Sequence, residues 1–562
     1  MNTTKRLAAV AVVSTLLLPA LGSPASAQAP KNGGVSAQTQ AAPANIQVNP
    51  SLGPPAAPYT NNFTQNFQMD PTIAQDPVTS AFVAGAMDYV DEAPCVQTGT
   101  SSSGYLTGYC QPSWWYTGID GLYLSSDGAN WTQPTASDGA TSSSGASCTA
   151  TTHTVPGYCA SGLASGYDPQ VTFGPKPKKP GVSFTFVHGA RAYYADLPLQ
   201  LNTNVPNPAV AVSRSDDDGH TWLAPVVLPG TTSHSIVNDK DALWVDANAS
   251  SPCFGDAYLA WDVSFDNTNT WQVAFSRSTD GGSTWSSYIT LLPQTTSLEP
   301  GPVIRSLPDG TAVVAFPGGV SGVPTIRDIP LTNCGQVVAA PVAVATFGNP
   351  PGVFPGALFP VWDFPMLASD NTGRLYLTWI DWTSGVSVLR FSMSADEGKT
   401  WSAPVAVSSG AGNAVTPAIA VTPDGAQILI QYQNEVATSQ TAGAGSASIQ
   451  TVYVRSTDGG ATWAQNPLSP SPVDVDGSST PQLDLQRIGD TAAMIVATIN
   501  RKQVAIPVWT DTRSAVPCPL VDSYRASLRA GHPASRPDPD VSNQCPLGFG
   551  NSDIDDALIP LN

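Results

Sequence analysis

Carboxylic residues recur along the chain at one kind of position, where a loop gives way to an apolar segment. The five residues are Asp70, Asp168, Asp241, Glu299 and Asp363. Carboxyl groups that meet in a confined site raise one another's pKa values, so one can stay protonated as an acid while another remains charged. Such a pair performs glycoside cleavage, and a ring of carboxylates would equally suit Ca²⁺. The structural alternative is that an acidic residue before proline only ends a turn and begins an edge strand.

Four other polar residues have side chains suited to a ligand site but lack a recurring pattern. Tyr432 and Glu435 offer a phenol and a rare glutamate that would serve as a nucleophile pair, although a solvated loop explains them as well. Arg305 and Arg513 have the charge to bind an acidic ligand. Their separation in the sequence gives no independent sign of a common site.

The eight cysteines predict disulfides, because an even number in an exported chain is typical of a disulfide framework. Spacing pairs Cys95 with Cys110 and Cys148 with Cys159. Elimination then leaves Cys253 with Cys334 and Cys518 with Cys545. Cys-x-x-Cys spacing is absent, so the sequence predicts no zinc site. It leaves the residues of any other metal site unknown.

Two adjacent tryptophans, Trp114 and Trp115, follow the first pair of cysteines. They predict either a platform on which a sugar ring stacks or a buried aromatic cluster under an inserted loop.

A repeated motif, Ser-x-Asp-x-Gly-x-Thr-Trp, indicates the elements that must position these residues. Full copies occupy Ser215 to Trp222, Ser278 to Trp285, Ser394 to Trp401 and Ser456 to Trp463, and a shortened copy spans Ser125 to Trp131. The motif is typical of a β-hairpin turn, in which Asp accepts amide hydrogen bonds and Gly adopts a positive φ. A short alternating strand precedes each copy.

A second element marks the start of each repeat: an acidic residue or threonine, often followed by proline, before an apolar strand. It begins at Asp70, Asp168, Asp241, Glu299, Asp363, Thr416 and Thr480. A period of roughly 50–65 residues with four strands per unit predicts a β-propeller. We therefore expect an all-β fold of four-stranded antiparallel blades, seven in number, with six as the alternative.

On these residues the chain resembles the sialidase-like superfamily of Asp-box, or bacterial neuraminidase repeat, proteins. The Trp509 to Arg513 stretch resembles the final blade of such proteins. The resemblance implies a β-propeller in which the box is structural, and an exo-α-sialidase-like glycoside hydrolase if the chain is catalytic. Sialidases carry an arginine in the first blade, whereas Phe67 to Tyr89 contains none. This disfavours sialic acid and leaves neutral sugars open.

The predicted ligand is an extracellular glycan or glycoprotein bound at the channel mouth, where the five first-strand carboxyl groups would converge. The alternative is a non-catalytic propeller that binds a protein partner or a cation. We expect no required cofactor, with Ca²⁺ as the one candidate ion, and a monomer.

The ends of the chain predict export. Residues 1–27 combine Lys5 and Arg6, an apolar run and an Ala-Ser-Ala cleavage site, which is the pattern of a signal peptide. Its removal deletes two basic residues and no acidic ones, which takes the net charge from −19 to −21. That charge disfavours nucleic acid, and no other segment is apolar for long enough to cross a membrane.

The expected organisation follows from these patterns. We expect residues 28–60 to form a low-complexity linker, and the alternative is that Ala44 to Val48 supply a strand that closes the last blade. The propeller spans 61–515, and a C-terminal extension, 516–562, packs on it.

Overall fold

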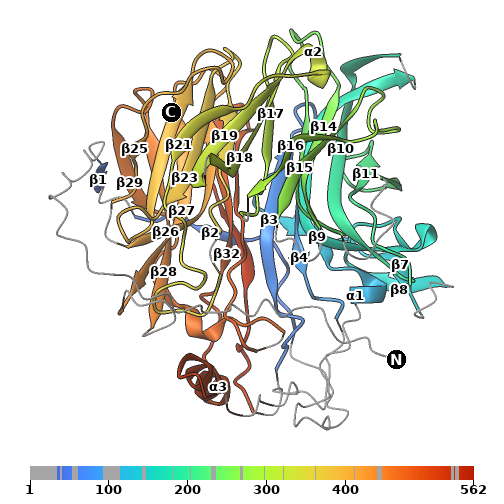
Figure 1. The fold of residues 1–562 in the computed structure, drawn as a ribbon. Helices are drawn as coiled ribbons and strands as arrows, with labels where there is room; N and C mark the ends of the chain where they lie inside the picture. Colours follow the sequence, from blue (N-terminus) through green and yellow to red (C-terminus); the bar gives the residue numbers. More distant parts are fainter. Residues whose placement is uncertain are drawn as a thin grey trace. The chain divides into compact units, whose positions relative to one another are not determined.

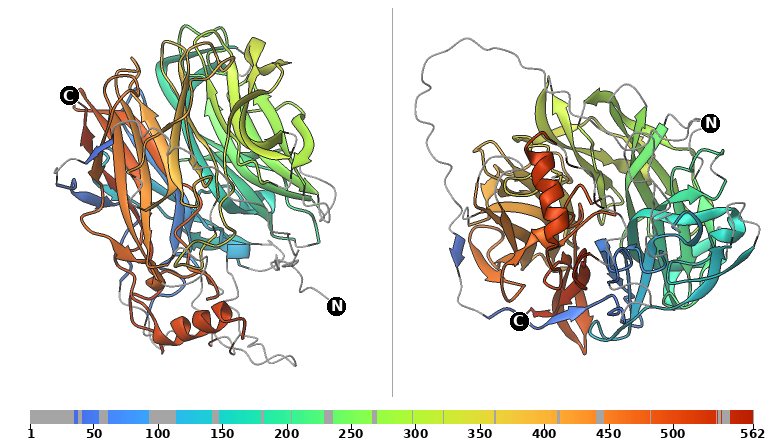
Figure 2. Two further views of the ribbon diagram at one scale, coloured as in Figure 1. Left: turned by 60° about the vertical axis from the view of Figure 1, so that its left-hand side comes forward. Right: turned by 90° about the horizontal axis from the view of Figure 1, so that it is seen from below.

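Seven sheets, each built on four antiparallel strands, form a β-propeller in the computed structural model (Figure 1). The structure describes residues 35–37, 41–53, 61–92, 114–141, 147–179, 182–202, 204–228, 236–265, 270–296, 298–320, 322–360, 362–409, 412–439, 446–481, 483–532, 534, 537 and 544–561. Viewed from below in Figure 2, the sheets are arranged around a central axis. The predicted fold class and the number of seven blades are confirmed, and the six-bladed alternative is wrong. The proposed signal peptide lies outside the described residues.

The first four blades follow one another along the chain, each from inner to outer strand. Blade 1 contains β3 (Gln68–Gln75), β4 (Phe82–Asp88), β5 (Asp120–Ser125) and β6 (Trp131–Thr132). Blade 2 contains β9 (Leu163–Lys179), β10 (Val182–Gln200), β11 (Ala211–Ser215) and β12 (Leu223–Val227). Blade 3 contains β13 (Ile236–Val245), β14 (Ala257–Phe265), β15 (Trp271–Ser278) and β16 (Ile289–Thr296). Blade 4 contains β17 (Val303–Ser306), β18 (Ala312–Val320), β19 (Val323–Leu331), β20 (Val337–Val338) and β21 (Val342–Thr346).

Blades 5, 6 and 7 complete the ring, and blades 6 and 7 include strands from the ends of the chain. Blade 5 contains β22 (Met366–Ser369), β23 (Leu375–Asp381), β24 (Val388–Ser394) and β25 (Val405–Ala406). Blade 6 contains β26 (Asn413–Val421), β27 (Ile428–Ala437), β28 (Ala447–Ser456), β29 (Trp463–Pro467), β30 (Val473–Asp474) and β1 (Val35–Ala37). Blade 7 contains β31 (Ala493–Ile499), β32 (Lys502–Asp511), β33 (Asp553–Ala557), β2 (Asn45–Gln47) and β34 (Ile559–Pro560).

Short elements decorate the blades. The two-stranded sheet of β7 (Ala136–Ala140) and β8 (Cys148–Thr152) follows blade 1. The helices are α1 (Trp114–Thr117), α2 (Thr332–Gly335), α3 (Pro519–Arg529) and the 3₁₀ turns η1 (Cys159–Ser161) and η2 (Val475–Gly477). Among the described residues, no helix has the length and apolar character needed to cross a membrane.

Blade 7 is closed by both ends of the chain. The strand β2 pairs antiparallel with β33, and β33 pairs with β32. The alternative assignment of residues 44–48 to a closing strand is therefore the one that the structure shows, and the propeller extends beyond 61–515. The expected inner-strand start at Thr480 is wrong, because β31 begins only at Ala493. Within that interval, Leu483 instead packs in a buried cluster with Val521 of α3.

Three of the four predicted disulfides lie within the described residues and are confirmed. They are Cys148–Cys159, Cys253–Cys334 and Cys518–Cys545. The expected pair Cys95–Cys110 lies outside the described residues. Cys253 and Cys334 are 81 residues apart, so this bond joins blade 3 to blade 4.

The four full motif copies, here called the box turns, connect the third strand of a blade to its fourth strand. In each, the serine hydroxyl donates to the aspartate carboxylate at 2.8–2.9 Å, and the carboxylate accepts the threonine amide at 2.8–2.9 Å. The glycine that follows has φ between 77° and 90°. The aspartates therefore close turns at the blade edge, remote in the topology from the inner strands.

We expect Asp396→Ala to lower the free energy of unfolding by about 1 kcal/mol, because the amide and hydroxyl of Thr400 lose their acceptor. Urea unfolding monitored by circular dichroism measures the change. Glu397→Ala in the same turn is the control, since Glu397 contacts only the exposed Lys399. Equal effects of the two substitutions would contradict a structural role for the box carboxylate.

Candidate functional site

The inner strands of several blades are distorted at equivalent points near their beginnings. Register shifts interrupt β3 after Met69, β13 after Asp239 and β26 after Val415. The first bulged residues, Asp70, Lys240 and Thr416, have φ of 56°, 49° and 44°, and Asp168 in β9 has φ of 56°. A bulge redirects the side chain that it contains. In each of these blades, one polar side chain thus departs from the regular alternation of side chains between the two faces of the strand.

The bulge in β13 changes one member of the predicted ring of carboxyl groups, Asp241. The residue equivalent to Asp70 is Lys240, and Asp241 occupies the next position. Because a shift of one residue turns a side chain to the other face of a strand, Asp241 does not occupy the position equivalent to Asp70. It is buried, and neither carboxylate oxygen has a hydrogen-bond partner among the described residues. Burial and the charges of Asp168 and Asp196 raise its pKa well above the usual value.

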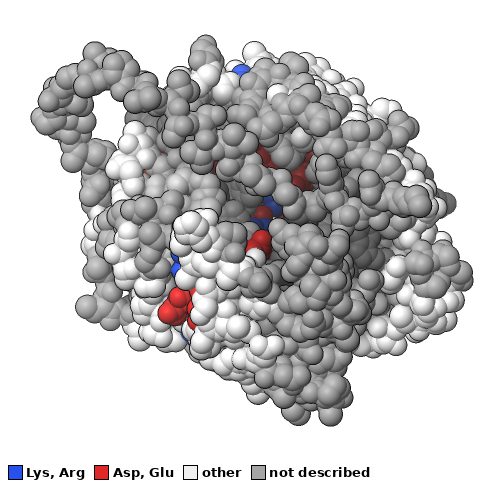
Figure 3. Space-filling view, turned by 60° about the horizontal axis from the view of Figure 1, so that its bottom comes forward, with Lys and Arg blue, Asp and Glu red and all other residues white. Residues whose placement is uncertain are grey.

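Lys240 is the centre of a charged group of side chains. Its Nζ lies 3.1 Å from an oxygen of Asp168, 2.9 Å from Asp490 and 4.0 Å from Asp239. Asp490 also pairs with Arg487 at 2.8 Å. We call these residues, with the neighbouring Asp70 and Glu299, the Lys240 cluster. On the face drawn in Figure 3, acidic and basic atoms lie together in a hollow.

Asp70 is tied to the cluster through the backbone of blade 7. One carboxylate oxygen accepts the amides of Asp490 and Thr491 at 2.5 and 2.9 Å. The other oxygen is buried without a hydrogen-bond partner within the described part of the chain. Burial, Asp490 and Asp168 raise the pKa of Asp70 to about 6.

The carboxyl groups of the cluster differ in their pKa values. Burial and Asp168 raise the pKa of Asp239 to about 7, against the opposing effect of Lys240. Burial also opposes ionisation of Asp490, but Arg487 and Lys240 together hold its pKa below the usual value. The site therefore contains a carboxylic acid that titrates near neutral pH beside a carboxylate that stays charged. This is the combination that acid catalysis requires.

Glu299 differs from the other acidic members because it is partly exposed and unpaired. Among the described residues it has neither a hydrogen-bond partner nor an ion-pair partner. Burial and Asp239 raise its pKa well above the usual value, and Lys240 counteracts them. Its carboxyl group is consequently available to a ligand.

A small pocket adjoins the cluster and has an aromatic wall. It is lined by Phe359, Pro360, Trp362, Val415, Thr416, Ile488, Gly489 and Asp490. The rings of Trp362 and Phe364 stack with centroids 5.8 Å apart and planes 6° from parallel. Phe364 also lies beneath Lys240, with Nζ 5.6 Å from the ring centroid. The pocket thus joins an apolar surface to the charged carboxylate of Asp490.

The helix α3 positions the segment that carries Arg487 and Asp490. Arg525 on this helix is fully buried and donates five hydrogen bonds of 2.9–3.1 Å to the segment 476–485. The next residue of that segment, Gln486, accepts the Leu358 amide at 2.6 Å. The C-terminal extension therefore supports both the charged and the aromatic sides of the pocket.

Asp363 is not brought into the Lys240 cluster. It lies between Trp362 and Phe364 and is buried, with one oxygen unpaired among the described contacts. Burial alone raises its pKa to about 6. Of the five predicted carboxyl groups, the structure thus places Asp70, Asp168 and Glu299 around Lys240.

Tyr432 and Glu435 do not form a nucleophile pair. The Tyr432 hydroxyl donates to Gln465 at 2.8 Å, and Glu435 accepts from Asn413 at 2.6 Å. Both side chains are buried in blade 6. They are hydrogen-bonded core residues, and the solvated loop that was the alternative is also wrong.

Both predicted arginines have partners within the propeller. Arg513 pairs with Asp511 at 2.8 Å and also with Asp555. Arg305 lies over the ring of Trp244, with the guanidinium carbon 4.3 Å from its centroid, and burial lowers the Arg305 pKa to about 10. Trp114 and Trp115 lie in α1, and their side chains are outside the described part of the structure.

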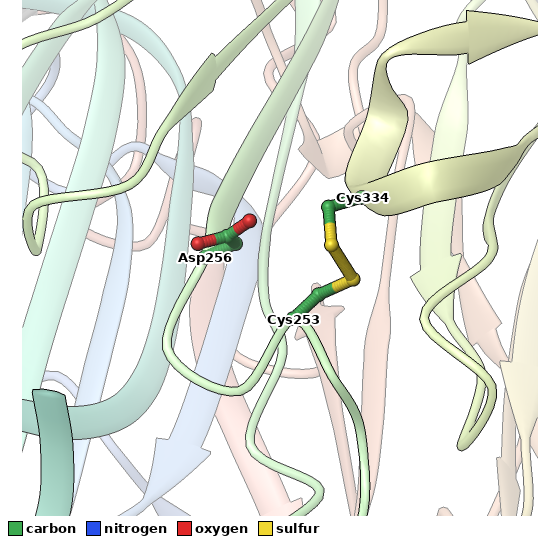
Figure 4. Close-up of side chains that lie close together, drawn as sticks. All are labelled: Cys253, Asp256 and Cys334. Atoms are coloured by element: carbon green, nitrogen blue, oxygen red, sulfur yellow. A yellow bond between two sulfur atoms is a disulfide. The ribbon is translucent and has the colours of Figure 1, made fainter.

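The residues present do not fit a Ca²⁺ ion at the cluster. The ammonium group of Lys240 already occupies the position between Asp168 and Asp490 where an ion would lie. Elsewhere in the described residues, only Cys253, Asp256 and Cys334 gather like metal ligands. Figure 4 shows that the two sulfur atoms are bonded to each other. They are therefore not thiolate ligands.

Four members of the cluster are absent from the sequence-based set: Asp239, Lys240, Arg487 and Asp490. Lys240 directly precedes the predicted Asp241, so a bulge in β13 was the missing information. Asp490 was missed because the seventh repeat was expected to start at Thr480. Extending the apolar pattern of 493–499 backwards would have placed Gly489-Asp490 at the correct point.

No family model and no curated protein matches the sequence, whereas a search of solved structures finds similar chains. An α-L-arabinofuranosidase of Fusarium graminearum is 16% identical, with a TM-score of 0.34 over 48% of this chain and 74% of that one. The Hadza microbial sialidase Hz136 is 16% identical, with a TM-score of 0.35 over 64% of this chain and 67% of that one. The NanB sialidase of Streptococcus pneumoniae is 10% identical, with a TM-score of 0.37 over 69% and 68%.

These similarities are too low to transfer an activity. The class of protein follows instead from the architecture described above. Seven blades, each built on four antiparallel strands and four of them carrying a box turn, define a seven-bladed β-propeller.

Proposed function

We propose that this protein is a glycoside hydrolase that acts at the Lys240 cluster. The observation that carries the proposal is the pairing of a charged carboxylate, Asp490, with a titrating carboxylic acid, Asp239, around one ammonium group. The aromatic wall formed with Trp362 adds a surface on which a sugar ring can pack.

In this mechanism Asp239 donates its proton to the glycosidic oxygen, and the leaving group departs as an alcohol. The negative charge of Asp490 stabilises the positive charge that develops at the anomeric carbon. A water molecule completes the reaction: its oxygen bonds to the anomeric carbon and its proton restores the Asp239 acid. Lys240 donates hydrogen bonds to the carboxylates of Asp168 and Asp490 and holds them in place.

The proposed setting is extracellular. Three disulfides among the described residues are consistent with an oxidising compartment. We propose that residues 1–27 direct export and that the mature monomer meets glycans or glycoproteins at the channel mouth. The net charge of −19 disfavours nucleic acid as a partner.

We expect the purified protein to hydrolyse at least one member of a panel of fluorogenic glycosides. Asp239→Asn removes the acid and should lower kcat by about 10²–10⁴-fold. Asp424→Asn, an exposed turn residue of blade 6, is the matched control and should retain full activity. Circular dichroism confirms that each variant is folded.

A non-catalytic glycan-binding propeller is the second candidate. It is favoured by the fact that Lys240 and Arg487 already neutralise Asp168 and Asp490. Absence of turnover across the panel, together with calorimetric binding of an oligosaccharide, would replace the hydrolase by this binding function.

A further inference from the structure

The Lys240 cluster contains more acidic groups than basic groups. Its five carboxyl groups, Asp70, Asp168, Asp239, Glu299 and Asp490, face two cationic groups, Lys240 and Arg487. Both cations contact Asp490, and Lys240 also contacts Asp168. Asp239 approaches Lys240 only at 4.0 Å, and among the described residues Asp70 and Glu299 have no ion-pair partner. The cluster therefore has carboxyl oxygens with which its own two cations do not pair.

Two unpaired acceptors show where that capacity lies. The second carboxylate oxygen of Asp70, a residue only 2% exposed, has no hydrogen-bond partner among the described residues, although Asp490, Asp168 and Lys240 surround it electrostatically. Glu299 is likewise unpaired within the described part of the chain, but it is partly exposed. A buried unsatisfied acceptor and an accessible one thus belong to the same cluster beside the pocket.

Lys240 demonstrates what this environment binds. Its primary ammonium group is held by two carboxylates at 2.9 and 3.1 Å and lies over the Phe364 ring. Carboxylates and an aromatic face are together the usual surroundings of an alkylammonium group. A second ammonium group would find the same kinds of partner in Glu299, Asp239 and Trp362.

We infer that the ligand of this site is a sugar that carries a free amino group, whose ammonium form pairs with Glu299 while the ring packs against Trp362. This inference rests on the proposed glycan-directed function and narrows its substrate class. Sugars with a carboxylate are disfavoured, because the two cations of the cluster, Lys240 and Arg487, are already paired with carboxylates of the protein. An N-acetylated sugar lacks the charge that the site is arranged to receive.

Isothermal titration calorimetry with chitosan tetramer tests the inference, with chitin tetramer as the uncharged control. We expect the chitosan tetramer to bind at least about tenfold more tightly and to weaken with added salt. Binding should also release protons, because an ammonium group beside Glu299 favours its charged form. Comparing buffers of different ionisation enthalpy detects that release.

The variant Glu299→Gln should abolish the preference for the charged tetramer, whereas Glu397→Gln on an outer turn should leave it unchanged. Equal binding of the two tetramers by the unsubstituted protein, or binding of neither, would overturn the inference regardless of how any variant folds. Binding of chitosan without hydrolysis would support the inference and contradict the hydrolase. Hydrolysis of neutral glycosides without a preference for an amine would support the hydrolase and contradict the inference.

Discussion

Lys240→Met is expected to lower the free energy of unfolding by about 3–5 kcal/mol near neutral pH, the range found when one partner of a buried ion pair is removed. Lys240 contacts Asp168 and Asp490, both of them buried. Without the ammonium group, Asp168 loses its ion-pair partner and Asp490 keeps only Arg487. Ligand binding at the cluster should be lost as well.

Urea unfolding at pH values of about 7 and about 4 measures this effect. The destabilisation should shrink at the lower pH, because burial raises the pKa of Asp70 to about 6 and that of Asp239 to about 7. Both groups are then protonated, and the cluster carries less negative charge for Lys240 to balance. Lys399→Met is the control, since Lys399 pairs with Glu397 on the surface and should contribute little. Similar losses in the two variants, or a loss that does not depend on pH, would contradict the central role of Lys240.

The second large effect is a decrease in stability as the pH rises. Burial raises the pKa of Asp196 to about 7 and that of Asp556 to about 8, and the pKa of Asp241 also lies well above its usual value. Below about pH 4 these groups are protonated in both the folded and unfolded states. Between that pH and the raised values, only the folded state keeps the protons. Stability is therefore lost progressively as the pH rises from about 4 through the raised values of about 7 to 8.

Asp241→Asn should remove part of this dependence and stabilise the protein by about 1–3 kcal/mol near pH 8. The reason is that neither oxygen of Asp241 has a described partner and its charged form is unfavourable there. Thermal unfolding followed from about pH 5 to about pH 8 tests both statements. Asp424→Asn is the control and should not stabilise, because hydrogen bonds from Thr422 and Ala426 favour its charged form and lower its pKa. A flat profile, or destabilisation by Asp241→Asn, would contradict the argument.

The sequence alone determined the fold class, and the reason is that the repeat is encoded locally. Ser-x-Asp-x-Gly-x-Thr-Trp specifies its own turn, since Ser394, Asp396 and Thr400 bond to one another within a few residues. Alternating apolar segments on either side specify strands of one sheet. Four such copies predicted the blades, and the three described disulfides followed from spacing and elimination.

The candidate site was determined only by the tertiary structure. Asp168, Lys240 and Asp490 come from three different blades, and Lys240 and Asp490 are separated by 250 residues. A one-residue bulge decided that Lys240 rather than Asp241 faces Asp168, and the hydrogen bonds of Arg525 hold the segment that leads to Asp490. Bulges and long-range contacts leave little trace in local sequence, because they depend on which strands pair and in which register.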